Sequence, residues 1–204
     1  MIGIIAYGSG NVKAIANIYK RLNLDYFITS DPGKLKEATR LILPGVGAFD
    51  QTMNLLNESG LRSVLDKLVL NDKIPVLGIC VGMQIMAESS EEGAEKGLGW
   101  ISGRVKKIDQ NKLHNKPKLP HMGWNSVILA KPNEIVEDVN FNKGFYFLHS
   151  YFMSPSNEED VLVKADYGQE FACVVKKENV VGIQFHPEKS HDNGIQVFKN
   201  FANI

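Results

Sequence analysis

The stretch Pro75-Val-Leu-Gly-Ile-Cys-Val-Gly-Met-Gln84 decides how this chain folds. Residues 76–79 form a short apolar run, which predicts a buried strand, and residues 83–88 predict a helix. Cys80 stands between the two, and a glycine lies two residues to either side of it. A sharp turn from strand to helix needs such small neighbours, because the strand and the helix pack closely there. The pattern is typical of a nucleophile elbow, with cysteine in place of serine.

A second cysteine provides a comparison for the first. At an elbow, the N-terminal N–H groups of the helix and the helix dipole favour the thiolate of Cys80. A free cysteine is also commonly a small buried hydrophobe, so the turn by itself leaves both interpretations open. Cys173 lies mid-strand in Phe171-Ala-Cys-Val-Val175, without flanking glycines or a following helix, and we interpret it as a packing residue.

Composition narrows the class of protein. The chain has 204 residues, of which 44% are hydrophobic, enough for a sizeable core. Lys and Arg together number 23, as do Asp and Glu, so the zero net charge predicts neither a nucleic-acid nor a membrane partner. With two cysteines, no recognisable signal peptide and no long apolar run, we expect a cytoplasmic protein without disulfides. No linker divides the sequence, and we expect one domain over residues 1–204.

Strands alternate with helices in the first half of the sequence. Apolar runs predict strands at residues 2–6, 25–30, 41–43 and 76–79. Apolar spacing predicts helices at residues 49–58 and 61–71, and one that ends at residue 22. This alternation predicts an α/β fold with a central, mostly parallel sheet covered by helices on both faces.

The second half of the sequence has a different pattern. A closing helix is predicted near residues 194–202. Before it come short β-like runs separated by turn residues, at 126–129, 144–149, 161–167, 171–176 and 180–185. These runs predict either a β-rich antiparallel extension or an irregular β-rich half.

An apolar strand ends at a histidine in Val181-Gly-Ile-Gln-Phe-His-Pro-Glu188. Pro187 keeps His186 out of the α region, and side chains two apart in an extended segment project to the same side. Glu188 can therefore fix the tautomer of His186 and stabilise its imidazolium, which is the orienting role in a triad. A lone histidine at a strand end commonly has no such role. Together with the elbow, however, the pattern predicts Cys80 as nucleophile, His186 as base and Glu188 as orienting residue.

A tetrahedral intermediate at Cys80 needs two hydrogen-bond donors for its oxyanion. One candidate is the backbone N–H of Val81, directly after the nucleophile. The second is the backbone N–H of Val46 in Pro44-Gly-Val-Gly47, where the glycines allow the peptide to reorient. An ordinary strand-to-helix turn remains the alternative for this loop.

Other uses of these residue types have little support in the sequence. There is no Cys-x-x-Cys or His-Glu-x-x-His pattern, so we predict no metal site. The glycine-rich loops lack the third glycine of a dinucleotide fingerprint and no P-loop occurs, so we predict no cofactor. We interpret His114 and His191 as solvated surface residues.

The sequence resembles the class-I (triad) glutamine amidotransferases over essentially its whole length. Among these enzymes it is similar to subunits that supply ammonia for histidine biosynthesis. The resemblance is carried by the elbow and by Tyr7-Gly-Ser-Gly-Asn11, Pro44-Gly-Val-Gly47, Glu88-Ser-Ser-Glu-Glu-Gly93, Gly97-Leu-Gly99, Pro120-His-Met-Gly-Trp-Asn125, His149-Ser-Tyr151 and Gln184-Phe-His-Pro-Glu-Lys-Ser190. It implies the flavodoxin-like fold of that family and hydrolysis of the side-chain amide of glutamine.

The resemblance also implies a glutamine pocket beside the nucleophile. Gln84 and Glu92 match positions that hold the amino-acid end of the substrate. The carboxylate of Glu92 is a suitable acceptor for the ammonium group, although such a residue read alone is an ordinary exposed carboxylate. Main-chain contacts to the substrate are matched by Gly47, Ser150 and Tyr151.

A separate (β/α)8-barrel synthase subunit is the partner that the resemblance implies, because the chain has no room for a domain that binds the ammonia acceptor. An exposed tryptophan beside methionine and histidine is a common anchor pattern, although Trp124 could equally fill the β-rich half. The family's interface positions match Tyr7, Asn11, His121, Met122, Trp124 and Asn125.

The sequence leaves several alternatives to this function open. Ala6 stands where the family usually has aspartate, and Val81 where leucine is common. A paralogous glutaminase that feeds a different barrel synthase, for example in surface-sugar amination, is one alternative. Another triad hydrolase or peptidase, and a non-catalytic binding module, are the others. We also expect weak activity without the partner, because movement of the loop at Val46 would control its oxyanion N–H.

Overall fold

The computed structural model describes residues 1–113 and 119–204. His114, expected to be solvated, lies outside these residues. The main sheet has the strand order β2-β1-β3-β4-β13-β12-β11-β8. Its strands are β1 (Ile2–Ile5), β2 (Tyr26–Thr29), β3 (Arg40–Gly45), β4 (Val76–Cys80), β8 (Ile128–Leu129), β11 (Val161–Asp166), β12 (Glu170–Lys177) and β13 (Val180–Ile183).

Two smaller sheets stand beside the main sheet. One has the order β10-β6-β5, and the other pairs β7 with β9. Their strands are β5 (Ser89–Ser90), β6 (Gly103–Lys107), β7 (His121–Asn125), β9 (Phe145–His149) and β10 (Tyr151–Pro155). The helices are α1 (Val12–Arg21), α2 (Pro32–Leu35), α3 (Phe49–Glu58), α4 (Arg62–Asp66), α5 (Val81–Gln84) and α6 (His191–Asn203).

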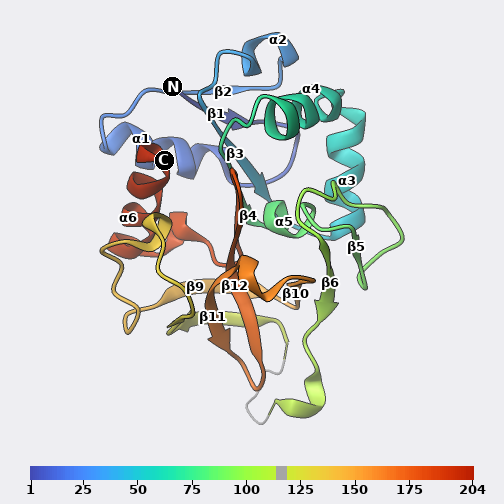
Figure 1. The fold of residues 1–204 in the computed structure, drawn as a ribbon, viewed down its shortest axis with the longest axis vertical. Coiled ribbons are helices and arrows are strands. Elements are labelled where there is room, and N and C mark those ends of the chain that lie inside the picture. Colours follow the sequence, from blue (N-terminus) through green and yellow to red (C-terminus); the bar gives the residue numbers. More distant parts are fainter. Residues whose placement is uncertain (114–118) are drawn as a thin grey trace.

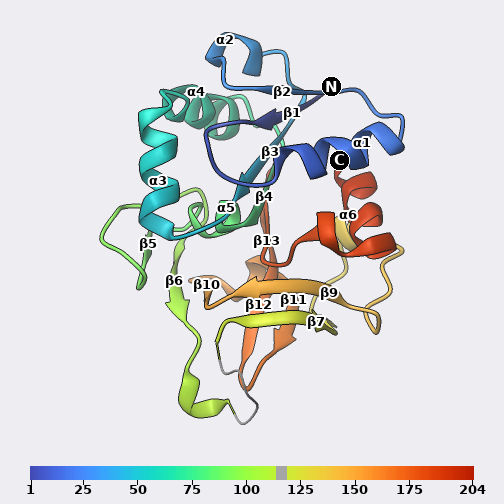
Figure 2. The same cartoon turned by 180° about the vertical axis from the view of Figure 1, so that it is seen from behind.

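The predicted parallel sheet with an antiparallel extension is confirmed. From β2 to β13 neighbouring strands pair in parallel, and from β13 to β8 they pair antiparallel. The extension therefore continues the same sheet. In Figure 1, α1 and α6 lie on one side of β3 and β4, and α3 lies on the other side. Figure 2 shows the same layers from behind, with the β-rich half below the helices.

The strands at the centre of the sheet are apolar because helices cover both of their faces. Leu41, Leu43, Val76 and Leu77 are completely buried. β13 lies between β4 and β12, and its register pairs Ile183 with Ile79. The carboxyl ends of β4 and β13 are therefore neighbours, which is where ligands bind in open α/β sheets. Within the described residues, no helix is long and apolar enough to cross a membrane.

The helix after Cys80 is shorter than predicted. We expected residues 83–88, whereas α5 spans Val81–Gln84. The next carbonyl groups accept hydrogen bonds from the segment 97–101 instead of continuing the helix: Leu98 N donates to Ile85 O at 2.7 Å, and Ile101 N to Met86 O at 3.1 Å. The helix predicted at 61–71 is divided into α4 and a π-helical turn, Lys67–Asn71.

Candidate active site

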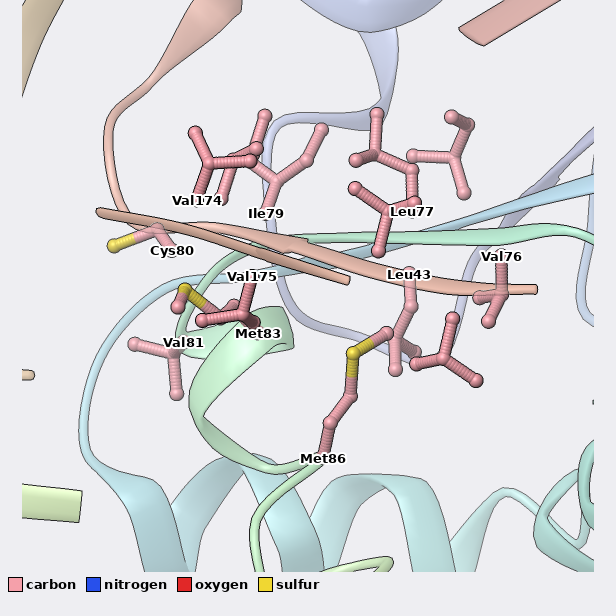
Figure 3. Packing of buried hydrophobic residues seen from close by; sticks show 14 of the residues in the cluster. Leu43, Val76, Leu77, Ile79, Cys80, Val81, Met83, Met86, Val174 and Val175 are labelled. Carbon is pink, nitrogen blue, oxygen red and sulfur yellow. The ribbon is translucent and has the colours of Figure 1, made fainter. Parts of the chain in front are cut away.

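Cys80 occupies a sharp turn between β4 and α5. Its φ is 56° and its ψ is −113°, a conformation that a residue with a side chain rarely adopts and that occurs at functional turns. The backbones meet closely here, because a Cβ on Gly82 would lie 2.0 Å from Leu43 O and one on Gly45 would lie 2.3 Å from Gly82 N. Figure 3 shows the sulfur of Cys80 at the end of the strand, beyond the apolar side chains Ile79 and Leu77.

His186 and Glu188 follow the neighbouring strand β13. The Nδ1 atom of His186 lies 2.8 Å from Oε1 of Glu188, and both side chains are almost completely buried. The backbone N–H of His186 donates to Tyr146 O at 2.9 Å, which attaches this segment to β9. A carboxylate accepts from Nδ1–H, so Nε2 is the ring atom left for the proton transfer that we expect of His186.

The pKa of His186 shows that its environment favours the protonated ring. Burial opposes the charge, but interactions with Cys80 and with Glu188 outweigh it and raise the pKa well above the usual value. The positions of Cys80 and Glu188 beside the ring thus favour the imidazolium form of His186. Burial raises the pKa of the Cys173 thiol, which lies mid-strand in the core and has no such partners.

A cavity of about 300 Å³ opens at Cys80. It is lined by Val46, Gly47, Cys80, Val81, Gln84, Glu92, Pro120, Leu148, His149, Ser150, Tyr151, His186 and Lys189. The structure thus brings together every residue that the sequence suggested for the nucleophile, base, oxyanion and substrate, and Glu188 lies behind His186. This volume suits a small-molecule ligand.

The two oxyanion candidates differ in their present hydrogen bonding. Val81 is the first residue of α5, where backbone N–H groups have no acceptor within the helix. Val46 N–H, by contrast, donates to the hydroxyl of Ser9 at 2.9 Å, and Ser9 Oγ donates to Val46 O at 3.0 Å. In this conformation the Val46 N–H is hydrogen-bonded to Ser9, so it is not free to donate to a ligand in the cavity.

Gln84 and Glu92, which we expect at the amino-acid end of the substrate, are fixed by hydrogen bonds to neighbouring segments. The Nε2 group of Gln84 donates to Tyr151 O at 2.8 Å and to Oε1 of Gln184 at 3.0 Å. The side-chain oxygen of Gln84 is therefore the atom that can accept a hydrogen bond from the ammonium group of a substrate. The Oε2 atom of Glu92 accepts from Phe49 N at 2.9 Å, which anchors this carboxylate at the start of α3.

The predicted interface residues do not all share one exposed surface. Met122 is 58% exposed and Trp124 is 47% exposed, and Trp124 stacks on His191 with 5.2 Å between ring centroids. His121 points to the opposite face of β7 and is buried. Its side chain is therefore not at the surface that Met122 and Trp124 form.

The loop from Tyr7 to Asn11 is also partly internal. Tyr7 is buried, and its hydroxyl donates to the carbonyl oxygen of Pro44. Asn11 is exposed and caps α1 by accepting from Ala14 N at 3.3 Å. Tyr7 and Ser9 thus both hold the loop from Pro44 to Gly47.

Sequence reasoning assigned no role to several residues of the cavity. Pro120, Leu148, His149 and Lys189 line it. The Nε2 group of Gln184 lies 3.8 Å from Cys80 Sγ. All but Leu148 lie within the motifs quoted above, so membership of those motifs was the available signal. Among the described residues, no group of three or more side chains could hold a metal ion.

Comparison with known proteins agrees with this geometry. Residues 5–204 match the family glutamine amidotransferase class-I. A protein of Leptospira borgpetersenii named imidazole glycerol phosphate synthase subunit HisH is 50% identical over 204 residues, which cover 100% of both chains. A Pseudomonas aeruginosa protein named imidazole glycerol phosphate synthase subunit HisH 2 is 44% identical over 207 residues, again covering 100% of both chains. A solved glutamine amidotransferase superposes with a TM-score of 0.73 at 20% identity, covering 100% of this chain and 99% of the other.

The chain therefore belongs to the class-I glutamine amidotransferases. Within that class its full-length similarity is to the HisH subunits of imidazole glycerol phosphate synthase.

Proposed function

We propose that this chain hydrolyses glutamine to glutamate and ammonia at Cys80. The observation that carries the proposal is the 2.8 Å contact of Glu188 Oε1 with Nδ1 of His186, a residue that lines the same cavity as Cys80, Gln84 and Glu92. A zwitterionic amino acid with a side-chain amide fits a site that has both a nucleophile and acceptors for an ammonium group.

The reaction has two halves. The thiolate of Cys80 attacks the carboxamide carbon, and the N–H groups of Val81 and, once it turns, Val46 stabilise the oxyanion. The imidazolium of His186 gives its proton to the departing nitrogen, so that ammonia leaves and a γ-glutamyl thioester remains. His186 then takes a proton from water, hydroxide attacks the thioester, and the thiolate returns as glutamate leaves.

The ammonia is passed to a (β/α)8-barrel synthase subunit that makes imidazole glycerol phosphate and AICAR in histidine biosynthesis. The names of the full-length relatives support this assignment. The exposed side chains of Met122 and Trp124 offer an apolar contact for the partner. The chain acts as one domain, and its two free cysteines suit the cytoplasm.

A different acceptor is the second candidate, because Ala6 stands where the family usually has aspartate, directly before the loop from Tyr7 to Asn11 that we expect to face the partner. In that case the same glutaminase would supply a different barrel synthase. Co-purification identifies the barrel protein, and the product formed with glutamine as nitrogen source identifies the reaction. Imidazole glycerol phosphate supports the first candidate, and a different aminated or amidinated product supports the second.

Two matched cysteine variants test the hydrolysis. Cys80→Ala should abolish glutamine hydrolysis and labelling by a diazo-ketone analogue of glutamine, because it removes the nucleophile. Cys173→Ala should retain both, since that thiol is buried away from the cavity. Equal hydrolysis by wild type and Cys80→Ala would refute the proposal.

A further inference from the structure

A chain of hydrogen bonds leads from Asn125 on β7 to Tyr151, which lines the cavity. The Nδ2 group of Asn125 lies 3.3 Å from Nε2 of His121. Nδ1 of His121 lies 3.0 Å from Nε2 of His149. Nδ1 of His149 lies 2.9 Å from the carbonyl oxygen of Tyr151. Two facing strands thus share a pair of histidines, since His121 and His149 are also register partners.

The chemistry of each group fixes the position of every proton in this line. A carbonyl oxygen only accepts, so Nδ1 of His149 carries hydrogen and Nε2 of the neutral ring is an acceptor. His121 must then donate from Nδ1, which makes its Nε2 an acceptor as well. Asn125 supplies the donor, and its Nδ2 group also donates to Asp166 O at 2.8 Å. Both rings are therefore neutral Nδ1–H tautomers.

Burial supports the neutral state of both rings. His121 is 3% exposed and His149 is 6% exposed. Burial lowers the pKa of His121 to about 4 and that of His149 to about 3, and for His149 the charges of His121 and His186 act in the same direction. The ring of His121 stacks between Phe147 and Tyr167, with centroids 4.8 Å and 4.1 Å away.

The same carbonyl oxygen connects the histidine pair to the substrate side of the cavity. Tyr151 O accepts both from His149 and from Nε2 of Gln84, at 2.9 Å and 2.8 Å. Gln84 also donates to Gln184, which reaches Cys80. If His149 loses its partner at Nε2, its ring has a buried unpaired acceptor, and it can turn away from Tyr151.

We propose that His121 is a positioning residue for glutamine binding: by donating to His149 it keeps the ring of His149 on Tyr151 O, and so fixes the main chain of Tyr151 and the side chain of Gln84. The inference rests on the proposed glutaminase function. It assigns His121 a role inside the molecule, distinct from a direct contact with a partner, because its side chain is buried.

Two variants of His121 separate hydrogen bonding from packing. In His121→Asn, the side-chain NH2 can take the place of Nδ1–H and donate to His149, but the aromatic stack is lost. In His121→Phe, the stack on Phe147 and Tyr167 remains, but the donor is lost. We expect His121→Phe to raise KM for glutamine about tenfold, as for an unmade buried hydrogen bond, with kcat changed less than KM. His121→Asn should keep KM within about threefold of wild type.

The measurement is glutamine hydrolysis by the complex with its synthase subunit, with thermal unfolding of each variant as a control for folding. A normal KM in His121→Phe, or a larger rise in His121→Asn than in His121→Phe, would refute the positioning role and show that packing dominates. Absence of hydrolysis in the wild-type complex would instead refute the proposed function.

A spectroscopic readout tests the proton positions without activity. Long-range proton–nitrogen correlation NMR on the wild-type chain at pH 7 should show Nδ1–H and unprotonated Nε2 for both His121 and His149. A His149 ring protonated at Nε2 would overturn the inference even if all variants were to misfold. In His121→Phe we expect the Nδ1–H signal of His149 to broaden or shift, because the ring loses its fixed position, whereas an unchanged signal would contradict the proposal.

Discussion

Ser9 and Val46 are joined by two hydrogen bonds that use the same hydroxyl group. Val46 N–H donates to Ser9 Oγ at 2.9 Å, and Ser9 Oγ donates to Val46 O at 3.0 Å. The peptide that we expect to stabilise the oxyanion is therefore held away from the cavity by one side chain. This peptide joins Gly45 to Val46, and because Gly45 has no side chain the peptide is freer to rotate when the hold is released.

Ser9→Ala should raise the glutaminase activity of the isolated chain about fivefold, because the Val46 peptide loses a partner worth about 1 kcal/mol in its resting orientation. Ser9→Thr retains the hydroxyl and should behave like wild type. The measurement is glutamate release without the synthase subunit. An unchanged or lower rate in Ser9→Ala would show that Ser9 does not restrain the peptide.

Glu188→Gln should lower kcat for glutamine by about 10² to 10⁴, because an amide no longer fixes and stabilises the imidazolium of His186. KM should change little. The pKa of His186, which its interactions with Cys80 and Glu188 raise, should fall in this variant. NMR titration of His186 in wild type and variant measures the shift, and an unchanged pKa would contradict the role of Glu188.

Gly82→Ala should destabilise the fold by about 3 kcal/mol or more, because the new Cβ would lie 2.0 Å from the backbone oxygen of Leu43. Gly60 is the matched control: its φ is 72°, and a Cβ there would meet nothing within 4 Å. Gly60→Ala should cost only about 1–2 kcal/mol, through its backbone conformation. Urea unfolding compares the two, and equal losses would argue against the close contact at the elbow.

Acid should destabilise the protein partly through His121 and His149. Their folded pKa values, about 4 and about 3, lie below the value of about 6.5 for an unfolded chain. As pH falls from about 6.5 towards 4, these histidines bind protons in the unfolded chain but not in the folded chain, so the free energy of unfolding decreases. Above about pH 6.5 the two histidines are neutral in both states and do not change the stability.

His121→Asn removes one of these two titrating histidines and leaves every carboxylate, the other source of acid sensitivity, in place. Between pH 7 and pH 5 it should therefore lose about 2 kcal/mol less stability than wild type, because only the unfolded histidine is protonated over the roughly 1.5 pH units between 6.5 and 5, at about 1.4 kcal/mol for each unit. Urea unfolding at both pH values gives the comparison. Parallel losses would show that His121 is not a buried neutral base.

The sequence predicted the parts of this protein that depend on local pattern. Residues 49–58 form α3 with the expected bounds, and the elbow glycines lie where the backbones touch. His-Pro-Glu places Glu188 against His186 because spacing within one segment determines that contact. Each of these signals lies within a segment of about ten residues, although the backbone that Gly82 meets belongs to Leu43 on another strand.

Features that depend on distant contacts were not predictable in the same way. The helix after Cys80 ends early because the segment 97–101 takes the carbonyl groups of Ile85 and Met86, and no local pattern reports this. His121 was grouped with Met122 and Trp124, although the alternation of a strand places it on the other face. The bond from Ser9 to Val46 joins residues 37 positions apart, so that only the fold reveals it.

The position of β13 has a consequence for when activity can begin. This strand is the last of the main sheet in the sequence, yet it lies between β4 and β12 at the centre. On the ribosome, Cys80 is made about a hundred residues before His186, and the strand that carries His186 to it must insert between strands already synthesised. In a growing chain, or in one that ends before residue 180, the cysteine that we propose as nucleophile would therefore lack the histidine that we propose as its base. We expect ammonia release to start only when β13 has entered the sheet between β4 and β12.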